Sequence, residues 1–472
     1  MKLILEGNDF VYECENLIRI FYPGIDLTID DGDFIVVSSD PNPRVFISVG
    51  GKELLKEAET EDKSEWAITG LLYDALCIFT GRQNIWGMLT GVRPVKLCID
   101  MMKKGLSREE VLREFIEKFK VSPDKAVLTY ECAETERPII ASSKENSVSV
   151  YVGIPFCPTR CKYCSFVCEG INSSKNLVSP YIDLLTKEIE FIGEKIKENG
   201  LEVASVYVGG GTPTSVSVEE LYKYLSALNK SVNAKNTPEF TVEAGRPDTI
   251  TREKLEILKE AGVHRISVNP QTLNDEVLRE IGRDHTREDF LRGYALAKEM
   301  GAFMINVDLI AGLPKDTEQS FLNSVNSVLS LNPDNITLHT LTLKRSAELY
   351  THKENYLRGE ETAREVALAV DLIKGKGYNP YYMYRQKNTL GALENTGFSL
   401  GKTECLYNIY IMDETHSIVA AGAGASSKAV SGRNNIIRSF NYKFPREYIS
   451  GFEEILKRKE KFFENIKNAG QI

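Results

Sequence analysis

Four cysteines lie within one short segment of the chain, at spacings that suit a metal centre. They are Cys157, Cys161, Cys164 and Cys168, and the pattern reads C-x3-C-x2-C-x3-C. Four thiolates can close around a zinc ion or an iron–sulfur cluster, because either centre takes four donors. Three thiolates can instead hold three irons of a 4Fe–4S cluster and leave the fourth iron open to a small molecule. The spacing alone leaves these alternatives open.

A glycine triplet supplies a second chemical signal close to the cysteines. Gly209, Gly210 and Gly211 occur in the segment YVGGGTPT, directly after a run typical of a β-strand. Glycines allow the backbone to approach a ligand closely and to present amide groups to its charges. An ordinary strand-to-helix turn has the same composition, so the triplet alone decides nothing. Its position one predicted strand after the cysteines favours a shared ligand site.

The elements that must position these residues alternate between strand and helix patterns. Six β-rich apolar segments are predicted as strands, at residues 148–154, 203–209, 239–245, 264–270, 303–313 and 335–341. Helical patterns separate them, which predicts a parallel sheet with right-handed crossovers that curls into a full or partial barrel. Ligand sites of such barrels lie at the carboxyl ends of the strands. The cysteines and the glycine triplet both follow a predicted strand at that end.

Residues that favour N-terminal caps predict where the helices begin. Ser179 and Pro180 predict the start of the helix after the cysteines, because proline is well suited to the first helical position. Further helix starts are predicted at Ser107, Ser217, Thr251, Asn274, Thr286 and Thr317. All of these positions except Ser107 mark the predicted beginning of a helix that follows one predicted strand and precedes the next.

The pattern divides the chain into three predicted domains. Residues 1–145 are predicted as an N-terminal α+β accessory domain. Its strand-like segments lie at 2–7, 33–39 and 44–51. Residues 146–345 are predicted to form the barrel, and residues 346–472 a C-terminal α/β extension that covers the substrate and ends in a helix.

Composition narrows the possible partners. The 472 residues carry a net charge of −9 without a basic block, which disfavours a nucleic-acid groove. Charges at Glu6, Asp9 and Glu13 interrupt the start where a signal peptide needs an apolar run, and no apolar stretch is long enough to cross a membrane. Nine cysteines, four of them grouped, suit a metal centre in a reducing cytoplasm better than disulfides.

Several motifs together resemble those of the oxygen-independent coproporphyrinogen oxidase family of radical S-adenosylmethionine enzymes. The segments are YVGIPFCPTRCKYCSF, GGGTPT, EAGRPDT, RISVNPQTL and NVDLIAGLP, and the resemblance continues in GMLTGVRPVKL, YYMYRQKN and GAGASSK. It covers almost the whole chain. The resemblance implies a six-stranded, three-quarter parallel barrel, with a 4Fe–4S cluster and S-adenosylmethionine as cofactors.

The same resemblance implies roles for individual residues. Cys157, Cys161 and Cys164 would ligate the cluster, which leaves Cys168 as a spare thiol. Gln271, Arg283 and Asp308 match positions that contact a second S-adenosylmethionine, and Arg283 and Asp308 are candidate catalytic residues. The full set of candidate cofactor-binding residues is Tyr151, Tyr163, Gly209, Gly210, Gly211, Thr212, Glu243, Gln271, Arg283 and Asp308. Glu243 suits this use because the cofactor carries a sulfonium and an ammonium group.

The implied reaction converts two propionates of coproporphyrinogen III to vinyl groups, giving protoporphyrinogen IX. A reducing donor such as flavodoxin or ferredoxin would supply electrons, and the tetrapyrrole would be the substrate, with neither nucleic acid nor membrane as a partner. Cations should anchor the substrate carboxylates, and Arg385 and Lys387 are candidates.

Two other functions remain open at the sequence level. One is a different radical reaction on a tetrapyrrole, such as ring-opening of haem with methyl transfer. The other is a haem-binding or trafficking protein. Related haem chaperones carry a histidine beside an asparagine, whereas this chain has Tyr407 beside Asn408, which weakens the haem-carrier interpretation. Gly153 also stands where the family often has histidine.

Overall fold

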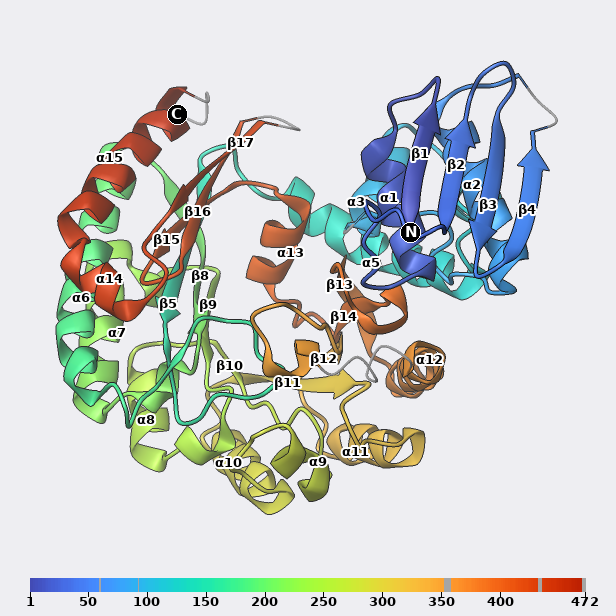
Figure 1. The fold of residues 1–472 in the computed structure, drawn as a ribbon. Helices are drawn as coiled ribbons and strands as arrows, with labels where there is room; N and C mark the ends of the chain where they lie inside the picture. Colours follow the sequence, from blue (N-terminus) through green and yellow to red (C-terminus); the bar gives the residue numbers. More distant parts are fainter. Residues whose placement is uncertain (59–60, 92, 352–357, 432–434, 469–472) are drawn as a thin grey trace.

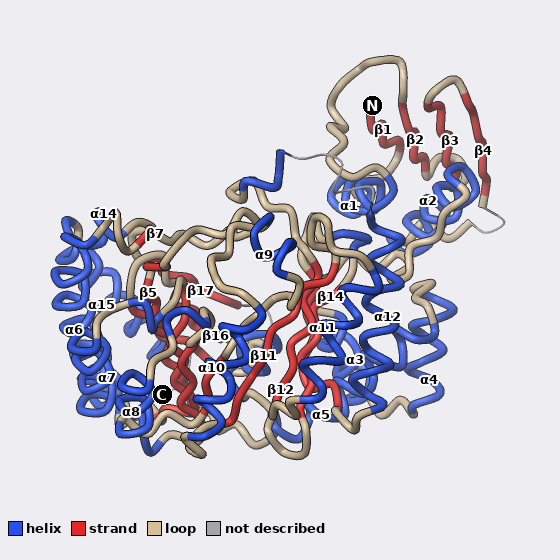
Figure 2. Tube along the Cα trace, turned by 90° about the horizontal axis from the view of Figure 1, so that it is seen from below, coloured by secondary structure: helices blue, strands red, loops and turns tan. Residues whose placement is uncertain are grey.

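Two β-sheets organise the chain in the computed structural model, which describes residues 1–472 except 59–60, 92, 352–357, 432–434 and 469–472. An eleven-stranded sheet curves through the larger part of the molecule and a four-stranded sheet forms the N-terminal part (Figure 1). Seen at right angles, the strands of the large sheet lie inside and most helices lie outside them (Figure 2). Among the described helices, none combines the length and apolar composition that a membrane span requires.

Six parallel strands form the centre of the large sheet. They are β5 (Ser147–Ile154), β8 (Glu202–Gly210), β9 (Glu239–Glu243), β10 (Arg265–Ser267), β11 (Met304–Ala311) and β12 (Asn335–Thr340). Each pairs in parallel with the next along the chain, so their carboxyl ends meet at one rim. The predicted partial parallel barrel is confirmed, and all six predicted strands are present.

Helices follow these strands and cover the outside of the barrel (Figure 1). They are α6 (Lys175–Glu198), α7 (Val218–Val232), α8 (Arg252–Glu260), α9 (Asp275–Glu280), α10 (Arg287–Glu299) and α11 (Glu318–Ser330). The predicted caps Ser217, Thr251, Asn274, Thr286 and Thr317 each accept a hydrogen bond from a backbone amide of the first turn. Those five helix starts are therefore confirmed.

The predicted start of α6 at Ser179–Pro180 is wrong. The helix begins at Lys175, and Pro180 lies inside it. Proline lacks the amide that would bond to the carbonyl of residue 176, but Asn176 is exposed and water can bind that carbonyl. Buried Ser174, whose hydroxyl donates to Glu169, anchors the earlier start.

The C-terminal part of the chain extends the sheet at both edges. At one edge, β13 (Asn379–Arg385) and β14 (Glu394–Ser399) follow β12 in antiparallel pairing. At the other edge, β15 (Ser417–Ala421) pairs in parallel with β5. The remaining elements are α12 (Gly359–Gly375), α13 (Leu406–Asp413), β16 (Ser426–Ser431), β17 (Asn435–Phe440), α14 (Pro445–Ser450) and α15 (Phe452–Asn468).

The N-terminal sheet has its own core. Its strands are β1 (Lys2–Glu6), β2 (Phe34–Ser38), β3 (Arg44–Val49) and β4 (Lys52–Glu57), and α1 (Val11–Phe21) and α2 (Glu65–Thr80) pack with them. The later helices share the core of the barrel instead, namely α3 (Pro94–Lys103), α4 (Arg108–Arg113) and α5 (Pro123–Ala141). Ser107 caps α4 as predicted. The division at residue 145 stays a prediction.

Candidate active site

The cysteine segment begins where β5 ends and is folded back on itself by two short strands. β6 (Phe156–Cys157) pairs with β7 (Glu169–Gly170), so Cys157 lies opposite Gly170. The amide of Lys162 donates to the carbonyl of Ile281, which fixes the middle of the loop. Backbone hydrogen bonds therefore hold the cysteines at the carboxyl-end rim of the barrel.

Polar neighbours give the thiols different proton affinities. Hydrogen bonding to Cys168 lowers the pKa of Cys157 and lowers the pKa of Cys164 to about 6. The same two contacts raise the pKa of Cys168. Thiolates bind metals, so the lowered pKa values of Cys157 and Cys164 suit that role. The assignment of Cys157, Cys161 and Cys164 as cluster ligands stays a prediction.

The arrangement of donors bears on the kind of metal centre. In the described part of the chain, no group of three or more His, Cys, Asp or Glu side chains is placed to hold a metal ion. A cluster makes a different demand, because each thiolate binds a separate iron of the cluster and the thiolates need not converge on one ion. Three thiols in one anchored loop fit that demand.

The glycine turn packs directly against the cysteine loop. The amides of Gly211 and Thr212 donate to the carbonyls of Ile154 and Phe156, at 2.8 and 2.7 Å. A Cβ atom on Gly211 would lie 2.6 Å from the Phe156 carbonyl oxygen, so any larger residue would push the two segments apart. The Thr212 hydroxyl donates to the Cys157 sulfur at 3.4 Å. The two motifs thus meet at one site.

Glu243 ends β9 beneath the glycine turn. Its carboxylate accepts a hydrogen bond from the Tyr207 hydroxyl at 2.6 Å. Burial raises the pKa of Glu243 to about 7, although the Tyr207 hydrogen bond opposes the rise; the charge of Asp308 adds to it. A Cβ atom on Gly209 would lie 2.9 Å from the Glu243 carboxyl carbon, so a larger residue there would displace the Glu243 side chain. A ligand with positive charge would stabilise this carboxylate.

Asp308 lies in β11, which β10 separates from the strand of Glu243. Asn269 and Asn306 each donate to its carboxylate at 2.7 Å, and His339 Nε2 lies 3.7 Å from it. Burial opposes ionisation, but hydrogen bonds from His339 and its other neighbours outweigh it and lower the pKa of Asp308. Two carboxyl groups of contrasting acidity, Glu243 and Asp308, therefore lie near enough for the charge of Asp308 to act on Glu243.

Three tyrosine rings form a stack beside Glu243. Tyr207 and Tyr407 lie 4.6 Å apart between ring centroids, and Tyr151 stacks near both at 6.3 and 6.2 Å. Tyr407 is buried in this stack. The sequence prediction placed Tyr151 at the cofactor, and the structure places it in this aromatic wall beside the predicted contact Glu243.

Several buried polar atoms near the loop have no hydrogen-bond partner among the described residues. They are Gln271 Oε1, Arg283 Nε and both ring nitrogens of His285. Gln271 also has a left-handed backbone, with φ of 69°, a strained conformation that is frequent at functional sites. The Arg283 side chain interacts with those of Tyr163 and Cys161. Unsatisfied buried donors and acceptors suit a polar ligand, so the site fits the predicted cofactor.

A basic cleft opens beside the site. Its volume is about 650 Å³, and in the described part of the chain its lining has seven basic side chains and one acidic one. The basic residues are Arg93, Lys344, Arg345, Arg385, Lys387, Lys428 and Arg438. The charge of Cys164 acts on Lys344, and that of Asp308 acts on Tyr384, which also lines the cleft. The cleft therefore adjoins both the cysteine loop and the barrel interior.

Sequence reasoning found two of these cations and missed five. Arg385 and Lys387 stand in a recognisable motif, whereas the others come from separate segments. In the structure, Arg385 donates to the carbonyls of Leu89 and Ala392 and stacks on Trp86, 4.9 Å from the ring centroid. Lys387 contacts Asn16 and Tyr12. Both cations therefore hold the N-terminal part in place as well as lining the cleft.

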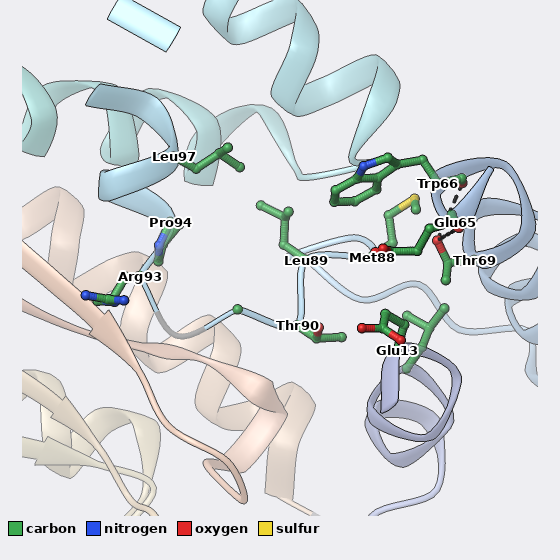
Figure 3. Close-up of a pocket in the computed structure, with 12 residues that line it drawn as sticks. Glu13, Glu65, Trp66, Thr69, Met88, Leu89, Thr90, Arg93, Pro94 and Leu97 are labelled. Atoms are coloured by element: carbon green, nitrogen blue, oxygen red, sulfur yellow. Dashed lines mark hydrogen bonds between the residues drawn. The ribbon is translucent and has the colours of Figure 1, made fainter. Parts of the chain in front are cut away.

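The segment 87–97 is the other feature that the motifs singled out. It crosses from the N-terminal part to the barrel and lines a cavity of about 220 Å³. In Figure 3, Met88, Leu89 and Thr90 of this segment lie between Trp66 and Glu13 of the N-terminal helices on one side and Arg93 on the other. Arg93 reaches the basic cleft, where it pairs with Glu414. The segment thus connects the two parts and carries one cleft cation.

Comparisons with known proteins place the chain in a family. Residues 151–328 match the model of the radical SAM superfamily. The oxygen-independent coproporphyrinogen-III oxidase-like protein HemZ of Bacillus subtilis is 36% identical over 493 aligned residues, which cover 99% of this chain and 98% of the relative. The chain belongs to the oxygen-independent coproporphyrinogen oxidase family of radical SAM proteins.

Two further comparisons show how widely the similarity extends. The solved structure of coproporphyrinogen III oxidase HemN of Escherichia coli shares the fold, with a TM-score of 0.54 and 22% identity over 68% of this chain and 72% of that one. The heme chaperone HemW of Bacillus subtilis is 37% identical over 203 residues, covering 43% of this chain and 52% of the relative. Membership in the family implies a 4Fe–4S cluster and S-adenosylmethionine, and it includes proteins with different named functions.

Proposed function

We propose that the chain is a radical SAM oxidoreductase that decarboxylates propionates of coproporphyrinogen III oxidatively, without oxygen, to give protoporphyrinogen IX. The observation that supports this most is the basic cleft beside the cysteine loop. A tetrapyrrole with several carboxylates needs cations that flank the reacting centre, and the described lining of the cleft offers seven against one carboxylate. Its volume of about 650 Å³ lies in the range of small-molecule sites.

The residues at the rim would hold the cofactors. In this proposal Cys157, Cys161 and Cys164 bind the cluster, and Glu243 faces the cationic groups of S-adenosylmethionine. The amides at Gly209–Thr212 and the side chains of Tyr151, Tyr163, Gln271, Arg283 and Asp308 complete the cofactor pocket. When bound, the cluster and S-adenosylmethionine supply a carbon radical that removes a hydrogen atom from the β-carbon of a propionate.

The chain's own groups then control what happens to the substrate. Cations of the cleft anchor the carboxylates that do not react, so that one propionate can reach into the barrel. The stacked rings of Tyr151, Tyr207 and Tyr407 exclude water from the reacting carbon. The propionate loses carbon dioxide and passes one electron to an acceptor, which leaves the vinyl group.

The proposal includes the chain's partners and location. A low-potential donor such as flavodoxin or ferredoxin would reduce the cluster, and neither nucleic acid nor membrane would take part. The nine cysteines are free thiols, which agrees with the proposed cytoplasmic location.

A haem-binding function is the second candidate, because several relatives carry the name heme chaperone. In the resemblance noted from the sequence, this chain has Tyr407 beside Asn408 where haem chaperones carry a histidine beside an asparagine. In this chain the ring of Tyr407 is buried and packs against those of Tyr151 and Tyr207. That burial favours the oxidoreductase. Ring-opening of haem with methyl transfer is a third possibility that uses the same barrel.

Anaerobic incubation with coproporphyrinogen III, S-adenosylmethionine and a reductant tests the proposal. The substrate should carry deuterium at the propionate β-carbons, and the Cys161→Ala variant is the control. We expect each of two propionates to lose carbon dioxide, its carboxyl proton and one β-deuterium, with that deuterium recovered in 5′-deoxyadenosine. A methylated open tetrapyrrole would favour the third function. Tight haem binding without turnover would replace the proposal with a carrier.

A further inference from the structure

Arg246 is a buried arginine that the sequence motifs do not explain. It follows β9 in the segment EAGRPDT and precedes the short helix η4 (Pro247–Thr249). Its side chain is 3% exposed and points toward the cysteine loop. A buried guanidinium is costly unless its donors are paired, so its contacts indicate its use.

The guanidinium of Arg246 binds a carboxylate on one side and donates to the cysteine loop on the other. Asp248 accepts from Nε at 2.9 Å and from Nη2 at 3.0 Å, the fork arrangement that holds an arginine rigidly. From the opposite side, Nη1 donates to the Thr159 hydroxyl at 3.2 Å and to the Cys161 sulfur at 3.9 Å. Asp248 thus aims Arg246 at one thiol.

Arg283 approaches the same sulfur from another element. It lies before α10, donates to the carbonyl of Asn269 at 2.6 Å and interacts with Cys161. In the part of the chain that the structure describes, Asp248 is the one carboxylate that pairs with either arginine. Two buried cations against one carboxylate leave a positive surplus beside Cys161, which an anionic thiolate-bound centre would neutralise.

We infer that Arg246, held by Asp248, is a positioning residue that donates to the Cys161 thiolate and raises the reduction potential of the cluster. This inference rests on the cluster that the proposed function assigns to Cys161. Adding an electron makes the cluster more negative, and a nearby cation with a hydrogen bond to a ligand sulfur stabilises the reduced form. The effect would ease the one-electron transfer from the donor to the cluster.

The test measures the cluster directly, without turnover. The full chain is loaded with iron and sulfide without air, iron is quantified, and the reduced cluster is followed by electron paramagnetic resonance during a reductive titration with dithionite. Arg246→Gln should disfavour reduction about tenfold, which is a fall of about 59 mV for one electron. Arg246→Lys keeps the charge without the fork and should show a smaller fall.

Arg252→Gln is the matched control. Arg252 lies six residues further along on the exposed side of α8, where it pairs with Glu299 at 2.8 Å. Its midpoint should equal that of the unmodified chain. An unchanged midpoint in Arg246→Gln, or an equal fall in Arg252→Gln, would overturn the inference.

The conservative variant Arg246→Lys decides the outcome if Arg246→Gln loses the cluster. If Arg246→Gln retains no iron, a lowered midpoint in Arg246→Lys supports the inference and an unchanged one overturns it. Failure of the unmodified chain to hold iron would instead defeat the proposed function. The two failures are therefore distinguishable.

Discussion

The rim of the barrel and the basic cleft beside it are built in opposite ways. At the rim, the cysteine loop, the glycine turn and Glu243 lie at the ends of strands, and hydrogen bonds fix the positions of the side chains, as between Tyr207 and Glu243. The cleft collects cations that range from buried to exposed, from segments that lie far apart in the chain. A site made of contiguous motifs keeps its chemistry through local backbone geometry. A site assembled from distant segments can change its occupant while the rim stays the same.

Glu414 is the centre around which the cleft is arranged. It ends α13 and contacts Arg93, Lys96, Lys428 and Arg438, with the last two at 3.3 and 3.8 Å. The cations hold the pKa of Glu414 below its ordinary value against the effect of burial. One carboxylate thus holds together four cations that would otherwise repel one another. Among the described hydrogen bonds of the rim, no single residue has this role.

The largest expected effect concerns the rim. Replacing Cys161 by alanine should reduce bound iron from about four atoms per chain to almost none, because two thiolates do not retain the cluster. Iron analysis and the visible absorption spectrum measure this. Cys168→Ala is the control and should keep iron and activity. Equal iron loss in the two variants would show a four-thiolate centre and exclude an open iron.

The second effect concerns the charge of Glu243. Glu243→Gln should weaken S-adenosylmethionine binding roughly 10- to 150-fold, the value of a charged hydrogen bond. Because the pKa of Glu243 is about 7, binding to the unmodified chain should weaken as pH falls below 7, where the carboxyl group becomes neutral. The Gln variant should lack that pH dependence. Isothermal titration calorimetry with S-adenosylmethionine between pH 6 and about 8 measures both affinities. Unchanged affinity in Glu243→Gln would place the cofactor elsewhere.

The third prediction separates two neighbouring cations of the cleft. Arg385→Ala leaves buried carbonyls of the 87–97 segment unpaired and should destabilise the fold by about 1–3 kcal/mol. Lys387→Ala, on the exposed side, should change stability by less than about 0.5 kcal/mol. Chemical denaturation measures both. An Arg385→Ala chain of normal stability with weakened porphyrinogen use would make Arg385 a substrate anchor.

The smallest effect concerns the outer cations of the cleft. Arg345→Ala and Arg438→Ala should each raise the KM for coproporphyrinogen about twofold to fivefold, because a solvent-exposed ion pair contributes little binding free energy. The increase in KM should be smaller at high salt, which screens exposed charges. Uncoupled cleavage of S-adenosylmethionine should stay unchanged. Arg364→Ala, which removes an exposed arginine that pairs with Glu318 on α11, is the control. An equal effect in that variant would remove the cleft from substrate binding.

The barrel was predictable because its signals are local. Strand composition and caps such as Ser217 and Thr286 act through the first turn of each helix, so the sequence alone locates them. The start of α6 was missed, since the side-chain anchor at Ser174 depends on the folded loop. The cleft was missed because Arg93, Lys428 and their neighbours meet only through sheet pairing across long sequence separations.

The pairing of β15 with β5 sets the earliest point during synthesis at which the sheet beside the cysteines can be completed. The cysteine loop follows β5 early in the chain, but the partner of that strand begins only at Ser417. A ribosome adding about 5–20 residues per second needs on the order of tens of seconds between the two. During that interval the edge beside the cysteines stays unpaired. The sheet beside the cysteine loop is therefore complete only after Ser417–Ala421 has been made, and a chain that stops before β15 would contain the cysteines without this support.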